Sequence, residues 1–252
     1  LRFAFSRTVT RPSFIEMAPF LYQESYGSAQ IRGNADLQNG YNYNIDLRYE
    51  LFEKNGDMLS ITAYYKHLKA PIERVQTLSG GSAVHSFRNA DNGMATGVEI
   101  EFRKEIVKDL RFGVNGSYMY TNVKLPEGGA YTNSQRALQG ASPYLANADL
   151  TYSPAFSNDR QLSVALLYNL QGPRIHSVGI SGLGDIKQQP VHTLNFTSSY
   201  RFNRRFAVKL QVNDLLNQDI LFKQEVPTTG DKVEVERFRK GTGFEVGFSY
   251  DL

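Results

Sequence analysis

The chain of 252 residues contains no cysteine and no tryptophan. Without cysteine it can form no disulfide, no thiolate nucleophile and no cysteine-based metal site. No segment approaches the roughly 18 consecutive apolar residues that a membrane-spanning helix requires, which excludes a helical membrane protein. The formal net charge is only +3, with both signs intermixed, and this does not suggest a nucleic-acid-binding protein.

Catalytic and cofactor motifs are also missing. The four histidines form no short-spaced pair and no His-Glu-x-x-His zinc motif. The glycine pairs at 80–81 and 128–129 and the glycine-rich stretch 179–184 precede neither Gly-Lys-Ser/Thr nor a helix, so we interpret them as loop hinges rather than phosphate cradles. No Gly-x-Ser-x-Gly motif is present. We therefore predict no enzyme, no cofactor and no metal site.

The most informative stretch is 244–252. Its apolar residues share one phase and its small or charged residues share the other: Phe244, Val246, Phe248, Tyr250 and Leu252 against Glu245, Gly247, Ser249 and Asp251. A β-strand has a side-chain period of two, so this pattern predicts a strand with one apolar, aromatic face. Such a strand is typical of the closing strand of a bacterial outer-membrane barrel.

Nine further segments show the same alternation, at 1–9, 42–51, 58–67, 96–105, 110–120, 144–152, 161–169, 191–202 and 206–213. None sustains a helical period. The connections between these segments alternate in length. Short, mostly polar turns lie at 52–57, 104–109, 153–160 and 203–205, and long loops lie at 10–41, 68–95, 121–143, 170–190 and 214–241. All long loops must therefore lie at one end of an up-and-down meander, as in outer-membrane barrels.

Charge and tyrosine placement support the same architecture. The charged strand residues fall on the polar phase, with Arg7 as the main exception: Arg2, Asp46, Arg48, Glu50, Lys66, Glu99, Glu101, Arg103, Arg111, Asp149, Arg201, Lys209, Glu245 and Asp251. Tyrosines in the apolar phase lie near strand ends, where amphipathic rings suit the headgroup boundary. We predict an all-β protein, an antiparallel up-and-down transmembrane β-barrel.

Several motifs resemble, in order along the chain, the C-terminal barrel of TonB-dependent outer-membrane receptors. They are Ser-Arg-Thr-Val-Thr-Arg-Pro-Ser-Phe at 6–14, Gly-Asn-Ala-Asp-Leu at 33–37, Gly-Val-Glu at 97–99, Gln-Gly-Ala-Ser-Pro-Tyr-Leu-Ala-Asn at 139–147 and Val-Asn-Asp-Leu-Leu-Asn at 212–217. The resemblance implies that residues 1–252 form about ten C-terminal strands of a 22-stranded barrel. The plug domain and the signal peptide would then lie outside this chain.

The resemblance also implies a function. The protein would be a receptor and transporter in the bacterial cell outer membrane that captures a scarce solute such as a siderophore, heme, a saccharide or a peptide through its long loops. The TonB energy-transducing complex would be its partner through the missing N-terminal part. Outer-membrane lipid or lipopolysaccharide would surround it.

Candidate ligand residues come from the long loops: His85, Arg88, Arg136, Arg174 and His176. Arginine can bind an anionic ligand and histidine a heme or a metal chelate. The plainer interpretation is solvated loop side chains, or arginines that pair with lipid or saccharide phosphates.

A rival architecture is a self-contained ten-stranded outer-membrane enzyme, a protease or lipid hydrolase. A soluble β-protein is a further alternative. The ten-stranded enzyme requires segments 1–9 and 244–252 to pair with each other, whereas the larger barrel requires both to pair with strands outside this sequence.

Overall fold

In the computed structural model, the described residues are 1–23, 30–79, 82–126, 132–154, 156, 159–179 and 182–250. The expectations at 80–81, 128–129, 180–181 and 251–252 lie outside these residues. No helix among the described residues is long and apolar enough to cross a membrane.

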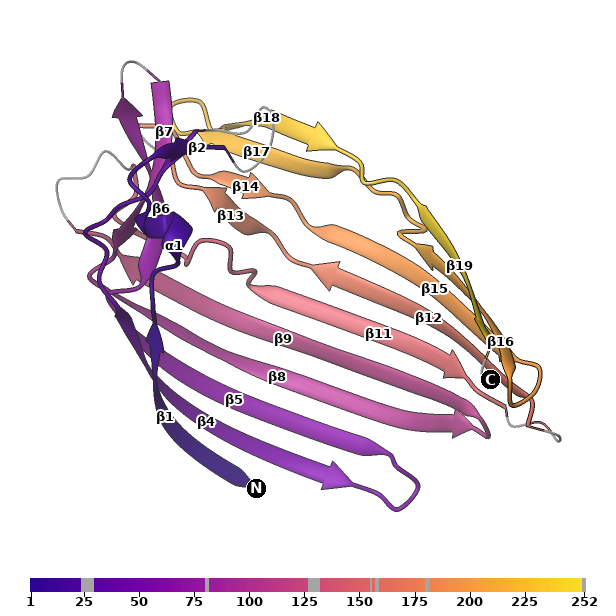
Figure 1. The fold of residues 1–252 in the computed structure, drawn as a ribbon. Helices are drawn as coiled ribbons and strands as arrows, with labels where there is room; N and C mark the ends of the chain where they lie inside the picture. Colours follow the sequence, from indigo (N-terminus) through magenta and orange to yellow (C-terminus); the bar gives the residue numbers. More distant parts are fainter. Residues whose placement is uncertain are drawn as a thin grey trace.

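One large antiparallel sheet forms most of the structure (Figure 1). Its strands follow one another in the order β1 (Arg2–Thr10), β4 (Gly40–Phe52), β5 (Met58–Lys69), β8 (Asn92–Val107), β9 (Leu110–Lys124), β11 (Tyr144–Tyr152), β12 (Gln161–Gln171), β15 (Val191–Arg201), β16 (Phe206–Asn213) and β19 (Gly243–Tyr250). A short strand, β10 (Gln135–Arg136), pairs with the end of β9. All ten predicted strands and the meander order are confirmed.

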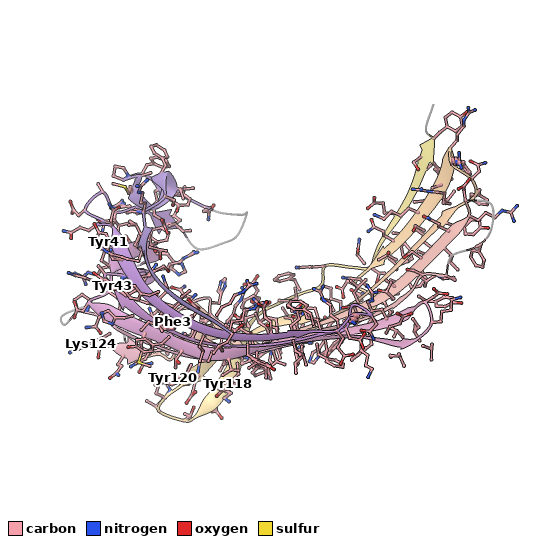
Figure 2. All side chains as sticks on the ribbon, turned by 90° about the horizontal axis from the view of Figure 1, so that it is seen from below. Phe3, Tyr41, Tyr43, Tyr118, Tyr120 and Lys124 are labelled. Carbon is pink, nitrogen blue, oxygen red and sulfur yellow. The ribbon has the colours of Figure 1, made fainter. Side chains whose placement is uncertain are left out.

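The sheet is curved and open (Figure 2). Among the described residues, β1 pairs only with β4 and β19 pairs only with β16. The closed ten-stranded barrel needs hydrogen bonds between β1 and β19, and the described residues contain none. The sheet therefore has the form of a segment of a larger barrel wall.

The strand register divides the sheet into the two predicted faces. Phe3 is paired with Leu47, and Ile45 with Tyr65, so their side chains lie on one side. Figure 2 shows Tyr118, Tyr120 and Lys124 on the convex side of the sheet. Large apolar side chains on this phase are open to the surroundings, as for Phe3 at 70% and Phe244 at 75% exposed. The polar phase faces the concave side.

The short turns sit together at one end of the sheet (Figure 1). In the 52–57 turn, the Glu53 amide donates to the Asp57 carbonyl at 2.9 Å. The Asp57 carboxylate accepts from the Glu105 amide, also at 2.9 Å, across to the neighbouring turn. That hydrogen bond lowers the pKa of Asp57, because it favours the charged carboxylate.

The long loops at the other end are more ordered than the sequence predicted. They fold into two small sheets. One contains β2 (Leu21–Tyr22), β3 (Ile31–Arg32), β7 (Ser82–Asn89) and β6 (Ile72–Ser79), and the other β13 (Arg174–Ser177), β14 (Ile186–Gln188), β17 (Ile220–Val226) and β18 (Asp231–Phe238). A one-turn helix, α1 (Phe14–Met17), begins at Ser13 with a capping box to Glu16. We call these elements, with β10, the cap.

The buried apolar core lies in and beneath the cap. The most deeply buried side chains are Ile31, Val123, Leu125 and Val178, each at most 1% exposed. The resembling motif at 33–37 belongs to this packing, because a Cβ on Gly33 would lie 2.3 Å from the Ala18 carbonyl oxygen. Within the wall, a Cβ on Gly97 would lie 2.5 Å from the Tyr118 carbonyl oxygen. Both positions require glycine for a close backbone approach.

Candidate functional site

A cavity of about 480 Å³ lies where the wall meets the cap. It is bounded by the loop end of β9, by β10 and the passage that follows it, and by β13 and β14. Its charged lining residues are Arg136, Arg174, Lys187 and Asp185. Three cations against one carboxylate make this lining suited to an anionic ligand.

Arg136 is buried in an ion pair with Glu73. Its terminal nitrogen lies 2.8 Å from a Glu73 carboxylate oxygen, and both side chains are at most 3% exposed. Another terminal nitrogen of Arg136 donates to the Ala137 carbonyl oxygen at 3.1 Å. Burial raises the pKa of Glu73, and the positive charge of Arg136 partly opposes that rise. The pair ties β6 of one small sheet to β10 at the edge of the wall.

The other cavity charges are held differently. Arg174 donates from Nε to the Gln188 side-chain oxygen at 2.7 Å, which fixes its guanidinium across the β13–β14 pair. Asp185 is 8% exposed and accepts from the Gly179 amide at 2.9 Å. Lys187 is exposed, and no carboxylate of the described chain lies within ion-pair distance of it. Arg174 and Lys187 are therefore the cations most available to a ligand.

A second cavity of about 260 Å³ adjoins the first, because Arg174 and Ile175 line both. Glu73, Arg74 and His176 contribute to its walls. His176 is exposed, and its ring packs edge-on against Phe222 with centroids 4.8 Å apart. The Arg136–Glu73 pair separates the two cavities, since Arg136 lines one and Glu73 the other.

The structure separates the predicted ligand candidates. Arg136 and Arg174 meet at the first cavity, and Arg174 and His176 meet at the second. Arg88 is exposed and lines neither cavity. Arg88 is exposed, as the solvated interpretation expects, whereas His176 is exposed but packs against Phe222 and lines a cavity. Arg136 is buried in its ion pair with Glu73, so the solvated interpretation is wrong for it.

The solvated interpretation is also wrong for His85, which is 4% exposed. Its Nδ1 accepts from Arg74 Nε at 2.8 Å, and its Nε2 lies 3.3 Å from the Ser177 hydroxyl. His85 thus links the two small sheets of the cap. Sequence reasoning missed Lys187, Asp185 and Glu73, which reach the cavities only through the pairing of loops distant in sequence.

The concave face of the wall carries a polar track below the cap. A hollow of about 340 Å³ there is lined by Arg48, Glu99, Glu101, Asn115 and Asn147, among others. Arg48 pairs with Glu50 at 2.9 Å, and Arg103 with Glu101 at 2.6 Å. Within the described part of the chain, no group of three or more His, Asp or Glu side chains could hold a metal ion.

Solved structures share this fold. The ferric enterobactin receptor of Pseudomonas aeruginosa, in a mutant form bound to enterobactin, superposes with a TM-score of 0.66 and 18% identity, over 98% of this chain and 38% of that one. The siderophore receptor PirA of Acinetobacter baumannii gives 0.61 and 14%, over 98% and 38%. The ferric yersiniabactin uptake receptor of Yersinia pestis gives 0.57 and 17%, over 85% and 30%.

An antiparallel meander with an apolar convex face and a polar concave face is the wall of an outer-membrane β-barrel. Residues 1–250 match the outer membrane protein beta-barrel family, and the chain belongs to that family. Its place is therefore the bacterial outer membrane. The chain spans less than two fifths of the length of the receptors it superposes on. No curated protein matches it.

Proposed function

We propose that this chain is part of a TonB-dependent receptor that imports an anionic solute of the siderophore class. The observation that carries the proposal is the cationic cavity built by the cap on a wall that superposes on siderophore receptors. Arg174 and Lys187 would contact the solute first. Arg136, already paired with Glu73, would shape the cavity floor.

The remainder of the receptor would complete the barrel. The open edges of β1 and β19 expose unpaired backbone groups, which lipid does not tolerate. Further strands, to a total of 22, would close the wall between them, and a plug domain would fill the lumen against the polar track. TonB would supply the energy that moves the plug. Residues 1–252 would then be the C-terminal part of the barrel.

The receptor proposal is favoured over an enzyme by the same geometry. A protease or hydrolase needs a nucleophile with a base, or paired carboxylates, within hydrogen-bond reach. The cavities instead contain mainly guanidinium, ammonium and amide groups beside the carboxylates of Asp185 and Glu73. The histidine that contacts a serine hydroxyl, His85, already accepts a hydrogen bond from Arg74. Binding chemistry is what this arrangement supplies.

Uptake of radiolabelled ferric catecholate and ferric hydroxamate chelates by whole cells tests the proposal. Cells that express the protein should accumulate the anionic ferric catecholate rather than the uncharged ferric hydroxamate, and cells without TonB should accumulate neither. Replacing Arg174 and Lys187 together by glutamine should raise the Kd of that chelate roughly 10- to 100-fold, the range expected for lost charged hydrogen bonds.

The matched control replaces Arg204 and Arg205, exposed cations at the opposite, short-turn end. Arg204→Gln/Arg205→Gln should bind the chelate as the native protein does. Uptake that persists without TonB would contradict the transport mechanism. Equal losses in the two double variants would contradict the assignment of the site.

A further inference from the structure

The convex face carries two rows of mostly polar side chains at the cap end of β1, β4, β5, β8 and β9. The register aligns one row across the strands as Arg7, Tyr43, His67, Met94 and Asn122. It aligns the next row as Val9, Tyr41, Lys69, Asn92 and Lys124. We call these ten positions the collar.

The collar is positively charged and contains no carboxylate. Arg7, His67, Lys69 and Lys124 are all exposed. Among the described residues, no ion pair joins either collar lysine to a carboxylate. Directly behind the collar, Leu68 and Val123 are buried beneath the cap. The collar cations therefore cannot turn inward and must meet whatever surrounds the barrel.

Aromatic rings of the collar contact Arg7 and His67. The Arg7 guanidinium lies 4.3 Å from the centroid of the Tyr41 ring and 5.7 Å from that of Tyr43. The Tyr43 ring also lies 6.2 Å from the ring of His67. Below the collar, the same phase is apolar: Phe3, Phe5, Ile45, Leu47, Ile61 and Tyr65. Because charges on the lipid face are tolerated near the interface and not at the midplane, the collar marks the boundary between acyl chains and headgroups.

The collar is confined to one half of the wall. At the same end of β11, β12, β15, β16 and β19, the outward positions include Tyr144, Leu170, Leu194, Val212 and Phe244 but no lysine or arginine. The polar exception is His192, whose Nδ1 lies 2.6 Å from the Tyr168 hydroxyl. A general need for headgroup contact would place cations all around the wall. A local cluster instead suits one multiply charged ligand.

We propose that the collar binds the phosphorylated disaccharide of lipid A, in the outer leaflet. Lys69 and Lys124 are two strands apart in one row, so they lie roughly 10 Å apart at their backbones, and Arg7 lies in the adjoining row. This spread suits a headgroup with a phosphate on each of two sugars better than a single phosphodiester. The proposal rests on the proposed function, because capture of a solute by the cap requires the cap to face the cell exterior.

The test measures binding of fluorescent lipid A to the protein purified in detergent from outer membranes. Replacing Arg7, Lys69 and Lys124 together by glutamine should weaken lipid A binding roughly 100-fold, given the usual contribution of each cation near anionic headgroups. The native protein should bind phosphate-free lipid A and phosphatidylglycerol far more weakly than lipid A. Lys69→Arg/Lys124→Arg, which keeps the charge, should bind as the native protein does.

The control variant replaces three lysines outside the collar, Lys66→Gln/Lys104→Gln/Lys209→Gln. Lys66 and Lys209 lie on the concave phase, and Lys104 is outward but at the short-turn end. Unchanged lipid A affinity in the collar variant, equal loss in the control, or equal binding of phosphatidylglycerol would each overturn the proposal. If the collar variant does not fold, two comparisons still test the proposal. The native protein should bind lipid A more tightly than phosphate-free lipid A, and Lys69→Arg/Lys124→Arg should keep native lipid A affinity.

Chelate binding, measured in the same samples, separates the two proposals. The collar lies outside both cavities, so the collar variant should keep native chelate affinity. Loss of lipid A binding with chelate binding intact supports the collar alone. A protein that binds lipid A through the collar and no chelate at all would contradict only the proposed function.

Discussion

The wall and the cap bury opposite kinds of surface. In the wall, large apolar side chains such as Phe244 and Phe248 are more than 70% exposed, and polar side chains line the concave face. In the cap and beneath it, Ile31, Val123 and Val178 are buried as in a water-soluble domain. Apolar side chains face outward in the wall and inward in the cap, because lipid solvates the outside of the wall and water solvates the cap.

The contrast extends to charge. The wall keeps its carboxylates and most of its basic groups on the concave face, for example Arg48 with Glu50. The cap buries a charged pair, Arg136 with Glu73, where neither group can reach water. Charges in the wall are thus positioned by strand phase, whereas charges in the cap are positioned by tertiary pairing. Each difference between wall and cap yields an experiment.

The largest expected effect is the presence or absence of labelling from outside the cell, which reports the side of the membrane that each region faces. The chain has no native cysteine, so single cysteines can be placed at Thr229 in the cap and at Asn55 in a short turn, both exposed. A membrane-impermeant maleimide should label Thr229→Cys in intact cells, and Asn55→Cys only after lysis, because long loops of such barrels face outward. The reverse pattern would contradict the orientation.

Arg136→Ala should destabilise the cap by about 3–5 kcal/mol, since it leaves the Glu73 carboxylate buried without its partner. Hydrogen exchange of the β6 and β10 amides measures this local effect. Glu73→Leu/Arg136→Met should recover most of the loss. Arg204→Ala, which breaks the exposed pair with Asp159, should cost about 0–1 kcal/mol. Equal losses of stability in Arg136→Ala and Arg204→Ala would show that burial of the cap ion pair makes no energetic difference.

In the wall, Phe196→Arg or Leu210→Arg should cost roughly 2–4 kcal/mol, because each places a charge in the hydrocarbon band. Their neighbours Thr197 and Gln211, paired with each other on the concave phase, should accept arginine at much lower cost. Urea titration of the protein folded in lipid vesicles measures the difference. Similar costs on both phases would show that the convex face does not meet lipid.

The smallest expected effect concerns the short turns. The hydrogen bond from the Glu105 amide lowers the pKa of Asp57, so its contribution to stability is present above the usual aspartate pKa of about 3.9 and is lost as pH falls below that value. The protection factor of the Glu105 amide, which corrects for the intrinsic pH dependence of exchange, should fall at acid pH in the native protein. In Asp57→Asn the exchange should show no such acid transition, and a matching transition there would rule out Asp57 as its source.

The architecture of the wall could be predicted from the amino-acid sequence. A period of two is a local property, so the ten strands, their lipid-facing phase and the alternation of short and long connections could all be predicted. The placement of Glu50 and Glu101 on the concave face follows from the same phase. The strand pattern and the motifs also predicted an outer-membrane β-barrel, which is the family that the comparison shows.

The cap and its cavities could not be predicted, because they form through contacts between segments that are distant in sequence. The pairing of Ile31 with His85 joins segments more than 50 residues apart, and that of Glu73 with Arg136 more than 60. No local period encodes such contacts, so His85 and Arg136 could not be predicted as buried. Lys187 reaches the cavity only because β14 pairs between β13 and β17. The collar could likewise be identified only from the strand register. Arg7, His67, Lys69 and Lys124 come from three strands and become neighbours only when these strands align.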